Sequence, residues 1–386
     1  IYDTYLLLFK KPTVDFDDKI VLELFIRGNK LFDECFKYIN NNKIDCIIPS
    51  HVCYSSYGII SRIALNKNIP VFKIKSENWG KALFRLIKID KNASVDEHPY
   101  YDYKKIFSKF SRLDKIKFRK IGKKLIEQRL SGNKDKNLPY MKVSSYNKHK
   151  DKKHLDDLKN NKSVIIFSHS LNDNPHRFRN MIFPDFYEQT KFLLKISNKF
   201  KNYSWLYKPH PNESFEMLKY HENMLSENKN VIMLNQNFSN SKILNLKPAL
   251  AITNHGTIGH EFAYSNVPVI NTGDNPHVSY KFCLNPRNKK ELKENILRVL
   301  EGTLRKNIIK DEIREFMFMH YEYFPNLYNR KKYLDDRFFS YTTYKVTDYS
   351  KPLNLYIKEN KNIQKQISMY INSFLDFELK WIFYTY

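Results

Sequence analysis

Cysteine is scarce in this chain, with four residues in 386. None of the four forms a CxxC pair, and no group of Cys and His residues has the spacing of a zinc site. The four are Cys35, Cys46, Cys53 and Cys283. We therefore expect reduced thiols in a cytoplasmic protein, without a structural disulfide or zinc ion.

Long apolar runs are also missing. No stretch approaches the roughly 18 apolar residues that a membrane-spanning helix needs. The first residues carry neither a start Met nor a charged-then-apolar leader, so we expect the true start to lie upstream. The apolar residues 5–9 are interpreted as the remainder of a first strand.

Acidic residues are outnumbered, with 41 Asp and Glu against 66 Lys and Arg, which gives a formal net charge of +25. Such an excess suggests an anionic partner: a phosphorylated substrate, an acidic glycan, an anionic membrane face or nucleic acid. The wealth of Lys, Asn and Ile is equally typical of compositional drift toward A/T-rich codons. Both explanations stay open.

The hydrophobic fraction of 42% is typical of a globular protein.

The periodicity of the first 150 residues predicts an N-terminal Rossmann-like domain. Residues 17–42 and 54–66 have apolar positions at helical spacing, and 44–48 and 70–74 resemble short buried strands. This alternation indicates a parallel sheet. Residues 99–150 are Lys-rich and mostly helical, as an insertion would be, and 148–162 is the predicted linker.

A second Rossmann-like domain is predicted over residues 151–310. Expected strands lie at 164–167, 204–208, 231–234, 249–253 and 267–270, and helices fit between them. Residues 311–386 are predicted to form a helical and aromatic tail. The predicted class is therefore α/β, with two doubly wound parallel sheets facing a central cleft. Ligands of such sheets bind beyond the carboxyl ends of the strands.

Two polar motifs follow predicted strands of the second domain. In Lys208-Pro209-His210-Pro211, the prolines fix the turn, and Lys208 and His210 are suited to a phosphate. The second motif spans residues 253–261. In it, Gly256 allows the backbone to approach a ligand closely, and Thr257 is a candidate helix cap. The Glu261 carboxylate is a candidate to accept hydrogen bonds from a ribose. The donor-site residues proposed from both motifs and the loop after 270 are Lys208, His210, Pro211, Asn254, His255, Gly256, Thr257, Glu261 and Asp274.

Sugar transfer to a hydroxyl also needs a base that removes the acceptor proton. Asp173, in the loop after the strand 164–167, is the first candidate, and a solvated Asx-turn is the competing interpretation. His51, after a strand of the first domain, is the second candidate. His176 and His260 are expected to lie at the cleft. No GxSxG elbow, P-loop or dinucleotide fingerprint is present, and no metal-binding Asp-x-Asp is recognised in either wall of the predicted cleft.

The motifs 205–211 and 254–263 resemble those of the capsule polysaccharide biosynthesis family of GT-B glycosyltransferases, which includes bacterial Kdo transferases. The resemblance covers residues 163–280 well and 44–75 weakly. It implies that His210-Pro211 holds the donor phosphate and that Glu261 occupies the acidic position of the donor-site turn. Asn254-His255 stands where many relatives carry Asn-Ser. Asp173 with Pro175-His176 is similar to a family loop.

The sequence therefore predicts a glycosyltransferase that uses a nucleotide-sugar, such as a CMP-Kdo-like donor, as substrate and needs no cofactor. It would be inverting and metal-independent, and would extend a capsule or lipopolysaccharide glycan. The basic surface would contact the inner membrane peripherally. A polyol-phosphate transferase of the teichoic-acid type or a nucleotide-sugar epimerase is the related alternative. A non-enzymatic nucleic-acid-binding protein is the third, although no nucleic-acid motif is present and no such partner is expected.

Overall fold

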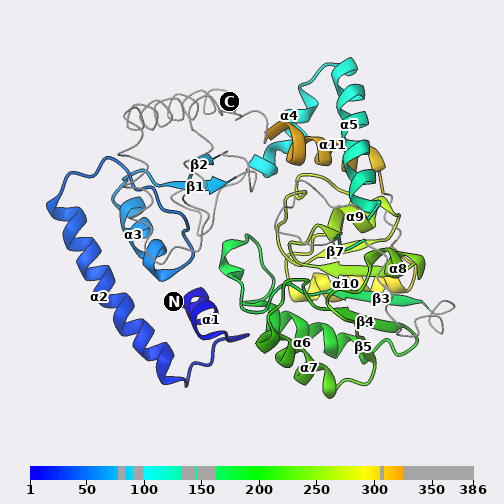
Figure 1. Ribbon diagram of the computed structural model, residues 1–386, viewed down its shortest axis with the longest axis horizontal. Helices are drawn as coiled ribbons and strands as arrows, with labels where there is room; N and C mark the ends of the chain where they lie inside the picture. The colour runs from blue at the N-terminus through cyan, green and yellow to red at the C-terminus, as the bar shows by residue number, and fades with distance from the viewer. Residues whose placement is uncertain (77–83, 90–98, 133–143, 147–161, 305–307, 325–386) are drawn as a thin grey trace, which may run out of the picture.

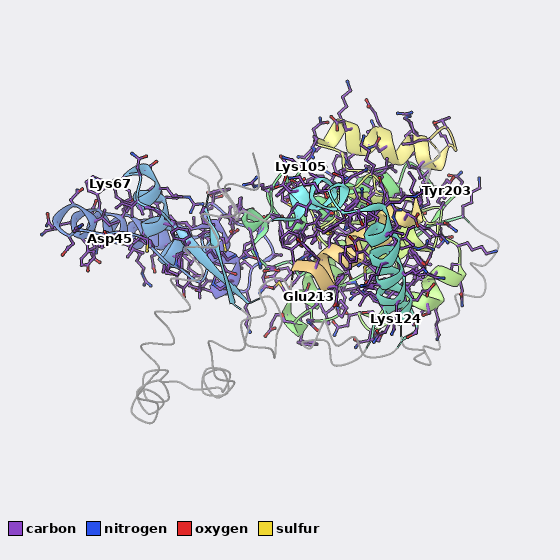
Figure 2. All side chains as sticks on the ribbon, turned by 90° about the horizontal axis from the view of Figure 1, so that it is seen from above. Asp45, Lys67, Lys105, Lys124, Tyr203 and Glu213 are labelled. Carbon is purple, nitrogen blue, oxygen red and sulfur yellow. The ribbon has the colours of Figure 1, made fainter. Side chains whose placement is uncertain are left out.

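The computed structural model describes residues 1–76, 84–89, 99–132, 144–146, 162–304 and 308–324. The helices of the N-terminal residues lie beside a larger lobe that is built on a parallel sheet (Figures 1 and 2). The predicted α/β class with a parallel sheet is confirmed. The predicted linker, apart from Lys162, and the predicted tail beyond 324 lie outside the described residues.

The parallel sheet has the order β5-β4-β3-β6-β7. Its strands are β3 (Ser163–Phe167), β4 (Ser204–Lys208), β5 (Val231–Met233), β6 (Leu250–Thr253) and β7 (Val269–Asn271). Within this sheet the chain passes first through the central strand β3 and then through β4 and β5 to one edge. It then returns, and β6 lies on the other side of β3. The strand order therefore reverses between β3 and β6, which is where ligands of such sheets bind.

Both faces of this sheet are covered, because successive side chains of a strand point to opposite faces. Val164 and Ile166 pack against α6 (Phe186–Ser197) and α10 (Lys289–Leu300) in one apolar cluster. Ile165 and Phe167 belong to a second cluster with α8 (Asn240–Asn245) and α9 (Ile258–Tyr264). Helix α7 (Phe215–Ser226) contributes Leu225 to the first cluster. The sheet is thus doubly wound, as predicted.

The second face also carries helices from distant parts of the chain. Helices α4 (Tyr103–Ser108) and α5 (Arg112–Leu130) pack with α11 (Lys310–Phe318) at the upper right of Figure 1. Phe118 stacks on Phe318 with ring centroids 4.1 Å apart. A Cβ on Gly122 would lie 1.9 Å from the Arg314 carbonyl oxygen, so these helices touch through their backbones. Residues 99–130, which the sequence pattern grouped with the N-terminal domain, share the core of the sheet lobe instead.

The N-terminal residues form three helices, α1 (Tyr2–Phe9), α2 (Lys19–Asn41) and α3 (Ser55–Asn66). An antiparallel pair, β1 (Phe72–Ser76) and β2 (Phe84–Lys88), follows them. The predicted strand-helix-strand unit around α3 is present as a single parallel bridge between Ile47 and Val71. A complete second doubly wound sheet is not formed by the described residues of this part.

The predicted strand at residues 5–9 is wrong, because these residues belong to α1. Leu6 is fully buried in a small cluster with Leu24 of α2, and the Tyr5 hydroxyl donates to Asp18 at 2.7 Å. A short apolar run fits a strand or a buried helix equally well, and packing against α2 selects the helix. No helix in the described part of the chain is both long and apolar enough to cross a bilayer.

Candidate functional site at the carboxyl ends of the strands

Three loops gather where the strand order of the sheet reverses. They follow β3 (residues 168–185), β4 (209–214) and β6 (254–257), and the strands that precede them are neighbours in the sheet. Because the strands are parallel, all three loops leave the same edge. Side chains that are far apart in the sequence therefore meet at this edge.

A row of rings connects the three loops. The ring centroids of His210 and His169 are 5.7 Å apart, those of His169 and Phe178 are 5.7 Å apart, and Phe178 lies 4.2 Å from His255. All four side chains are partly exposed. The structure thus brings His210 together with His255, the neighbour of Gly256. His169, which was not among the predicted site residues, lies between the two other histidines of this row.

The backbone fixes the protonation of His210. The Asn212 backbone N–H donates to His210 Nδ1 at 3.2 Å, so this nitrogen carries no proton. Burial, with a smaller contribution from His169, lowers the pKa of His210 to about 4. The ring is therefore neutral at physiological pH, and its proton resides on Nε2. It can donate one hydrogen bond to a ligand oxygen without carrying a charge.

Asp173 lies beside this row with 38% of its side chain exposed. One of its carboxylate oxygens accepts a hydrogen bond from the Asn174 backbone N–H at 2.8 Å. The other is 3.5 Å from His169 Nδ1. A half-exposed carboxylate next to an imidazole is a suitable acceptor for a proton. This hydrogen bond comes from the next residue and not from the one after it, so it is not the Asx-turn that was the competing interpretation.

The loops after β3 and β4 are joined by the buried Glu213 carboxylate. One oxygen accepts from Ser170 Oγ at 2.8 Å and from the Ser214 backbone N–H at 3.3 Å. The other accepts from the Leu171 N–H at 3.2 Å and from His221 Nε2 at 3.1 Å. The Tyr207 hydroxyl donates to His221 Nδ1 at 2.6 Å, which leaves the His221 proton on Nε2. This network holds the segment that carries His169 and Asp173 against the one that carries His210.

Lys208 and Glu261 lie away from the ring row, on the face covered by α8 and α9. Lys208 is 2% exposed and donates to Asn240 Oδ1 at 2.6 Å. Burial lowers the pKa of Lys208 to about 8, and Glu261 opposes that shift. Glu261 is 1% exposed and is bound by the Arg129 guanidinium and by the Tyr146 hydroxyl at 2.7 Å. These groups form an internal charge cluster that ties α5 to α9.

Asn254 and Asp274 are also occupied by internal contacts. Asn254 is 1% exposed, exchanges hydrogen bonds with Gln189 and donates one to Thr272 Oγ1. Asp274 accepts from Arg287 at 2.7 Å, Tyr101 at 2.8 Å and Asn180 at 2.7 Å. Its backbone carbonyl lies 2.9 Å from His255 Nδ1. Both side chains therefore hold in place the segments around His255, and neither has a polar group directed toward solvent.

The turn after β6 is compact. Gly256 is partly exposed, and a Cβ there would lie 2.7 Å from Thr253 Oγ1, so a side chain would displace the turn. Thr257 is the residue before α9, but its side chain forms no capping hydrogen bond. The predicted cap is therefore absent, although its position is right. Pro211 is partly exposed beside His210.

The other histidines proposed from the sequence are dispersed. His260 is 2% exposed and packs against His277, Phe316 and Tyr321, so the prediction that it lies at the cleft is wrong. Its place on α9 points it toward α11, which no local pattern could have revealed. His51 is half-buried between Tyr54 and Tyr57, with Nδ1 3.1 Å from Ser50 Oγ.

His176 lies at the junction of the two parts, where its Nδ1 is 2.7 Å from Asp3 Oδ1. It lines a cavity of about 730 Å³ between the N-terminal helices and residues 175–184. Polar lining residues of this cavity include Asp3, Asn29, Tyr54, Arg62, His176 and Asn180. Pro175 and His176 line the cavity and closely follow Asp173 in the chain, so the cavity adjoins the Asp173 loop. The described residues contain no cluster of three metal-ligating side chains.

No family model matches the chain, and no curated protein matches it in sequence. Among solved structures, UDP-GlcNAc 2-epimerase from Neisseria meningitidis bound to UDP-GlcNAc is 14% identical with a TM-score of 0.33, over 78% of this chain and 81% of the other. The S. aureus MnaA–UDP structure is 13% identical with a TM-score of 0.34, over 78% and 79%. KpsC from Thermosulfurimonas dismutans, a β-Kdo 2,4 transferase, is 12% identical with a TM-score of 0.40, over 70% and 78%. At these values none of them assigns this chain a family, a substrate or a residue's role.

Proposed function

We propose that this chain is a glycosyltransferase that binds a nucleotide-activated sugar at the carboxyl ends of β3, β4 and β6. The observation that carries the proposal is the row of partly exposed rings, His210, His169, Phe178 and His255, at the point where the strand order reverses. Ligands of doubly wound sheets bind at that point. Imidazoles suit phosphate oxygens, and a phenyl ring suits a sugar or base face.

In this proposal His210 stabilises the leaving nucleotide. Its Nε2–H, fixed by the Asn212 hydrogen bond to Nδ1, would donate to a phosphate oxygen next to the sugar. As the bond between the sugar's anomeric carbon and that phosphate breaks, negative charge grows on the phosphate. A fixed donor aimed at developing charge lowers the barrier, because no reorganisation is needed at the moment of reaction.

Asp173 is the proposed base. An acceptor hydroxyl in the adjoining cavity would form the new bond to the anomeric carbon, and its proton would pass to the Asp173 carboxylate. His169, 3.5 Å from that carboxylate, would orient it. Attack from the side opposite the leaving phosphate inverts the anomeric centre. The proposed acceptor is a growing capsule or lipopolysaccharide glycan, and a CMP-Kdo-like molecule is the proposed donor; both rest on the motif resemblance.

Donor binding can be tested by thermal unfolding with CMP, UDP, GDP and CDP ligands. A ligand at 100 times its Kd stabilises the folded state by about 2.7 kcal/mol, which shifts Tm measurably. We expect one nucleotide to shift Tm and the shift to vanish in His210→Ala. His210→Gln, whose amide N–H can replace the Nε2–H donor, should restore part of it. If no nucleotide shifts Tm, or if His210→Ala keeps the full shift, the proposed donor site is wrong.

The reaction itself is tested with the nucleotide-sugar that binds. Asp173→Asn should abolish transfer while leaving the donor-induced Tm shift unchanged, because the carboxylate acts on the acceptor. Full turnover in Asp173→Asn would refute the base assignment. An isomerised nucleotide-sugar without transfer would identify the chain as an epimerase, and transfer of a polyol phosphate as the teichoic-acid type of enzyme.

A further inference from the structure

Helix α5 exposes a basic face that the proposed reaction does not use. The helix contains eight basic and two acidic residues over Arg112–Leu130. Its inward side packs on the sheet lobe through Phe118, Gly122 and Ile126. Opposite that side, at spacings of four and three residues, lie Leu113, Lys117, Lys120 and Lys124, all exposed. At 3.6 residues per turn these four side chains form one row along the helix.

Lys117, Lys120 and Lys124 have no counter-ion among the residues that the structure describes. Neither acidic residue of α5 neutralises them: Asp114 binds Ser111 at the helix start, and Glu127 is 3.7 Å from Lys123. None of the three forms an ion pair with any residue that the structure describes. Like charges three and four residues apart on a helix repel one another and cost stability. An external anionic surface would remove that cost.

Apolar side chains extend the same face toward the helix start. Leu113 is 79% exposed and Ile116 is 45% exposed, directly beside the lysine row. Lys105 and Lys109 of the preceding segment are exposed as well. Figure 1 places α5 at the outer corner of the sheet lobe, away from the N-terminal helices. A rigid helix at a corner, with lysines and exposed apolar residues on one side, has the composition of an interfacial helix.

We propose that this face of α5 docks on an anionic phospholipid bilayer. Lysines near such a surface gain attraction from its negative potential, and Leu113 and Ile116 would enter the boundary between headgroups and acyl chains. The exposed apolar pair favours lipid over nucleic acid, because a phosphate backbone offers no apolar layer. The inference goes beyond the proposed reaction and does not depend on it.

The test is co-sedimentation of the full chain with phosphatidylcholine vesicles, with and without phosphatidylglycerol. We expect binding to the anionic vesicles only. The triple variant Lys117→Ala, Lys120→Ala, Lys124→Ala should lose about 100-fold in partition coefficient, since each lysine near the surface contributes. Alanine keeps the helix, which unfolding experiments verify. The variant Leu113→Ser, Ile116→Ser should weaken binding without changing the net charge.

The matched control removes three exposed lysines in and just after α6, which covers the opposite face of the sheet: Lys195→Ala, Lys199→Ala, Lys201→Ala. The control changes net charge equally, so a specific α5 face predicts a loss below about threefold. The inference is overturned if both triple variants lose binding equally, or if the wild type does not bind anionic vesicles. It is also overturned if the α5 lysines affect only binding to single-stranded nucleic acid.

Discussion

Glu213 shows how a single buried carboxylate can organise a site that it does not enter. Both of its oxygens accept hydrogen bonds from the two loops and from His221, and its side chain is fully buried. Every neighbour donates, so the residue needs two acceptor oxygens and a negative charge. Its role is to position His169, Asp173 and His210 relative to one another.

Replacing Glu213 by Gln should therefore be costly despite the equal size. An amide NH₂ must face either the Ser214 N–H or the Leu171 N–H, because each oxygen has a backbone donor. We expect a loss of about 3 kcal/mol in the free energy of unfolding, measured by urea denaturation. The control is Glu216→Gln, whose solvent-exposed pair with Lys10 should leave the free energy of unfolding nearly unchanged. Equal effects of both variants would contradict the positioning role.

Acid should destabilise the fold through three histidines. Burial lowers the pKa of His210 to about 4, and burial also lowers the pKa of His260 and His277 well below 6.5. The unfolded chain binds these protons near pH 6.5, and the folded chain does not, so stability falls as pH falls below about 6.5. Each group contributes up to about 1.4 kcal/mol per pH unit.

The measurement is urea unfolding at several pH values between 4 and 8. His260→Leu should reduce the slope below pH 6.5, because Leu has no proton to bind. It should also raise stability at pH 7, since neither ring nitrogen of His260 has a hydrogen-bond partner among the described residues. An unchanged slope in this variant would show that His260 does not contribute to acid lability.

At the scale of elements, the contact between α5 and α9 depends on the ion pair of Arg129 and Glu261. Both side chains are buried, and Tyr146 binds the second carboxylate oxygen. Breaking a buried pair leaves one charge without compensation, which costs more than the pair contributes.

Glu261→Ala should therefore lower the free energy of unfolding by about 3 to 5 kcal/mol. The double variant Arg129→Met, Glu261→Leu removes both charges and should recover part of this loss. Denaturant unfolding of the single and double variants measures the difference. If the double variant is less stable than Glu261→Ala, the charge left on Arg129 is not the cause. Nucleotide-induced Tm shifts in the same variants report separately on the ribose-binding role expected for Glu261.

The elements themselves were largely predictable from the sequence of the sheet lobe. Strands β3, β4 and β6 and helices α6, α7 and α10 lie where apolar periodicity indicated them. Strand β2 was missed, because five residues hold too little periodicity to be distinguished from a loop. Helix α1 was mistaken for a strand, since its helical state depends on packing against α2.

The site was predictable only in part. The loops after β3, β4 and β6 follow from topology, since parallel strands end at one edge. Topology does not predict which side chains of these loops point into the protein. Lys208 is enclosed by Asn240, and Glu261 by Arg129 and Tyr146. All three partners are remote in sequence. Local spacing contains no signal for such contacts.

At the scale of the whole molecule, the N-terminal part and the sheet lobe each have apolar cores of their own. Polar contacts join the two parts. Ile39, Ile63 and Val71 form a core in the N-terminal part, separate from the cores of the sheet lobe. Polar contacts between the parts include the Tyr2 hydroxyl to Asp185 at 2.5 Å and His176 to Asp3 at 2.7 Å. Small polar junctions of this kind permit the parts to unfold independently.

Calorimetry should therefore resolve two unfolding transitions. Ile63→Ala should lower the Tm of one and Leu206→Ala that of the other, each by removing about 2 to 5 kcal/mol of core stability. A nucleotide bound only by the loops of the sheet lobe should raise mainly the second transition. A single transition that both substitutions shift equally would show that the two cores unfold as one cooperative unit.

The packing of α5 against α11 also has a consequence for biosynthesis. One face of the parallel sheet is covered by residues translated before its first strand and by residues translated after its last. While the ribosome makes residues 163–271, the residues of α5 have been translated but those of its partner α11 have not. The apolar surface that they will share stays open until residue 318 leaves the exit tunnel, and nascent chains with such surfaces are typical clients of chaperones.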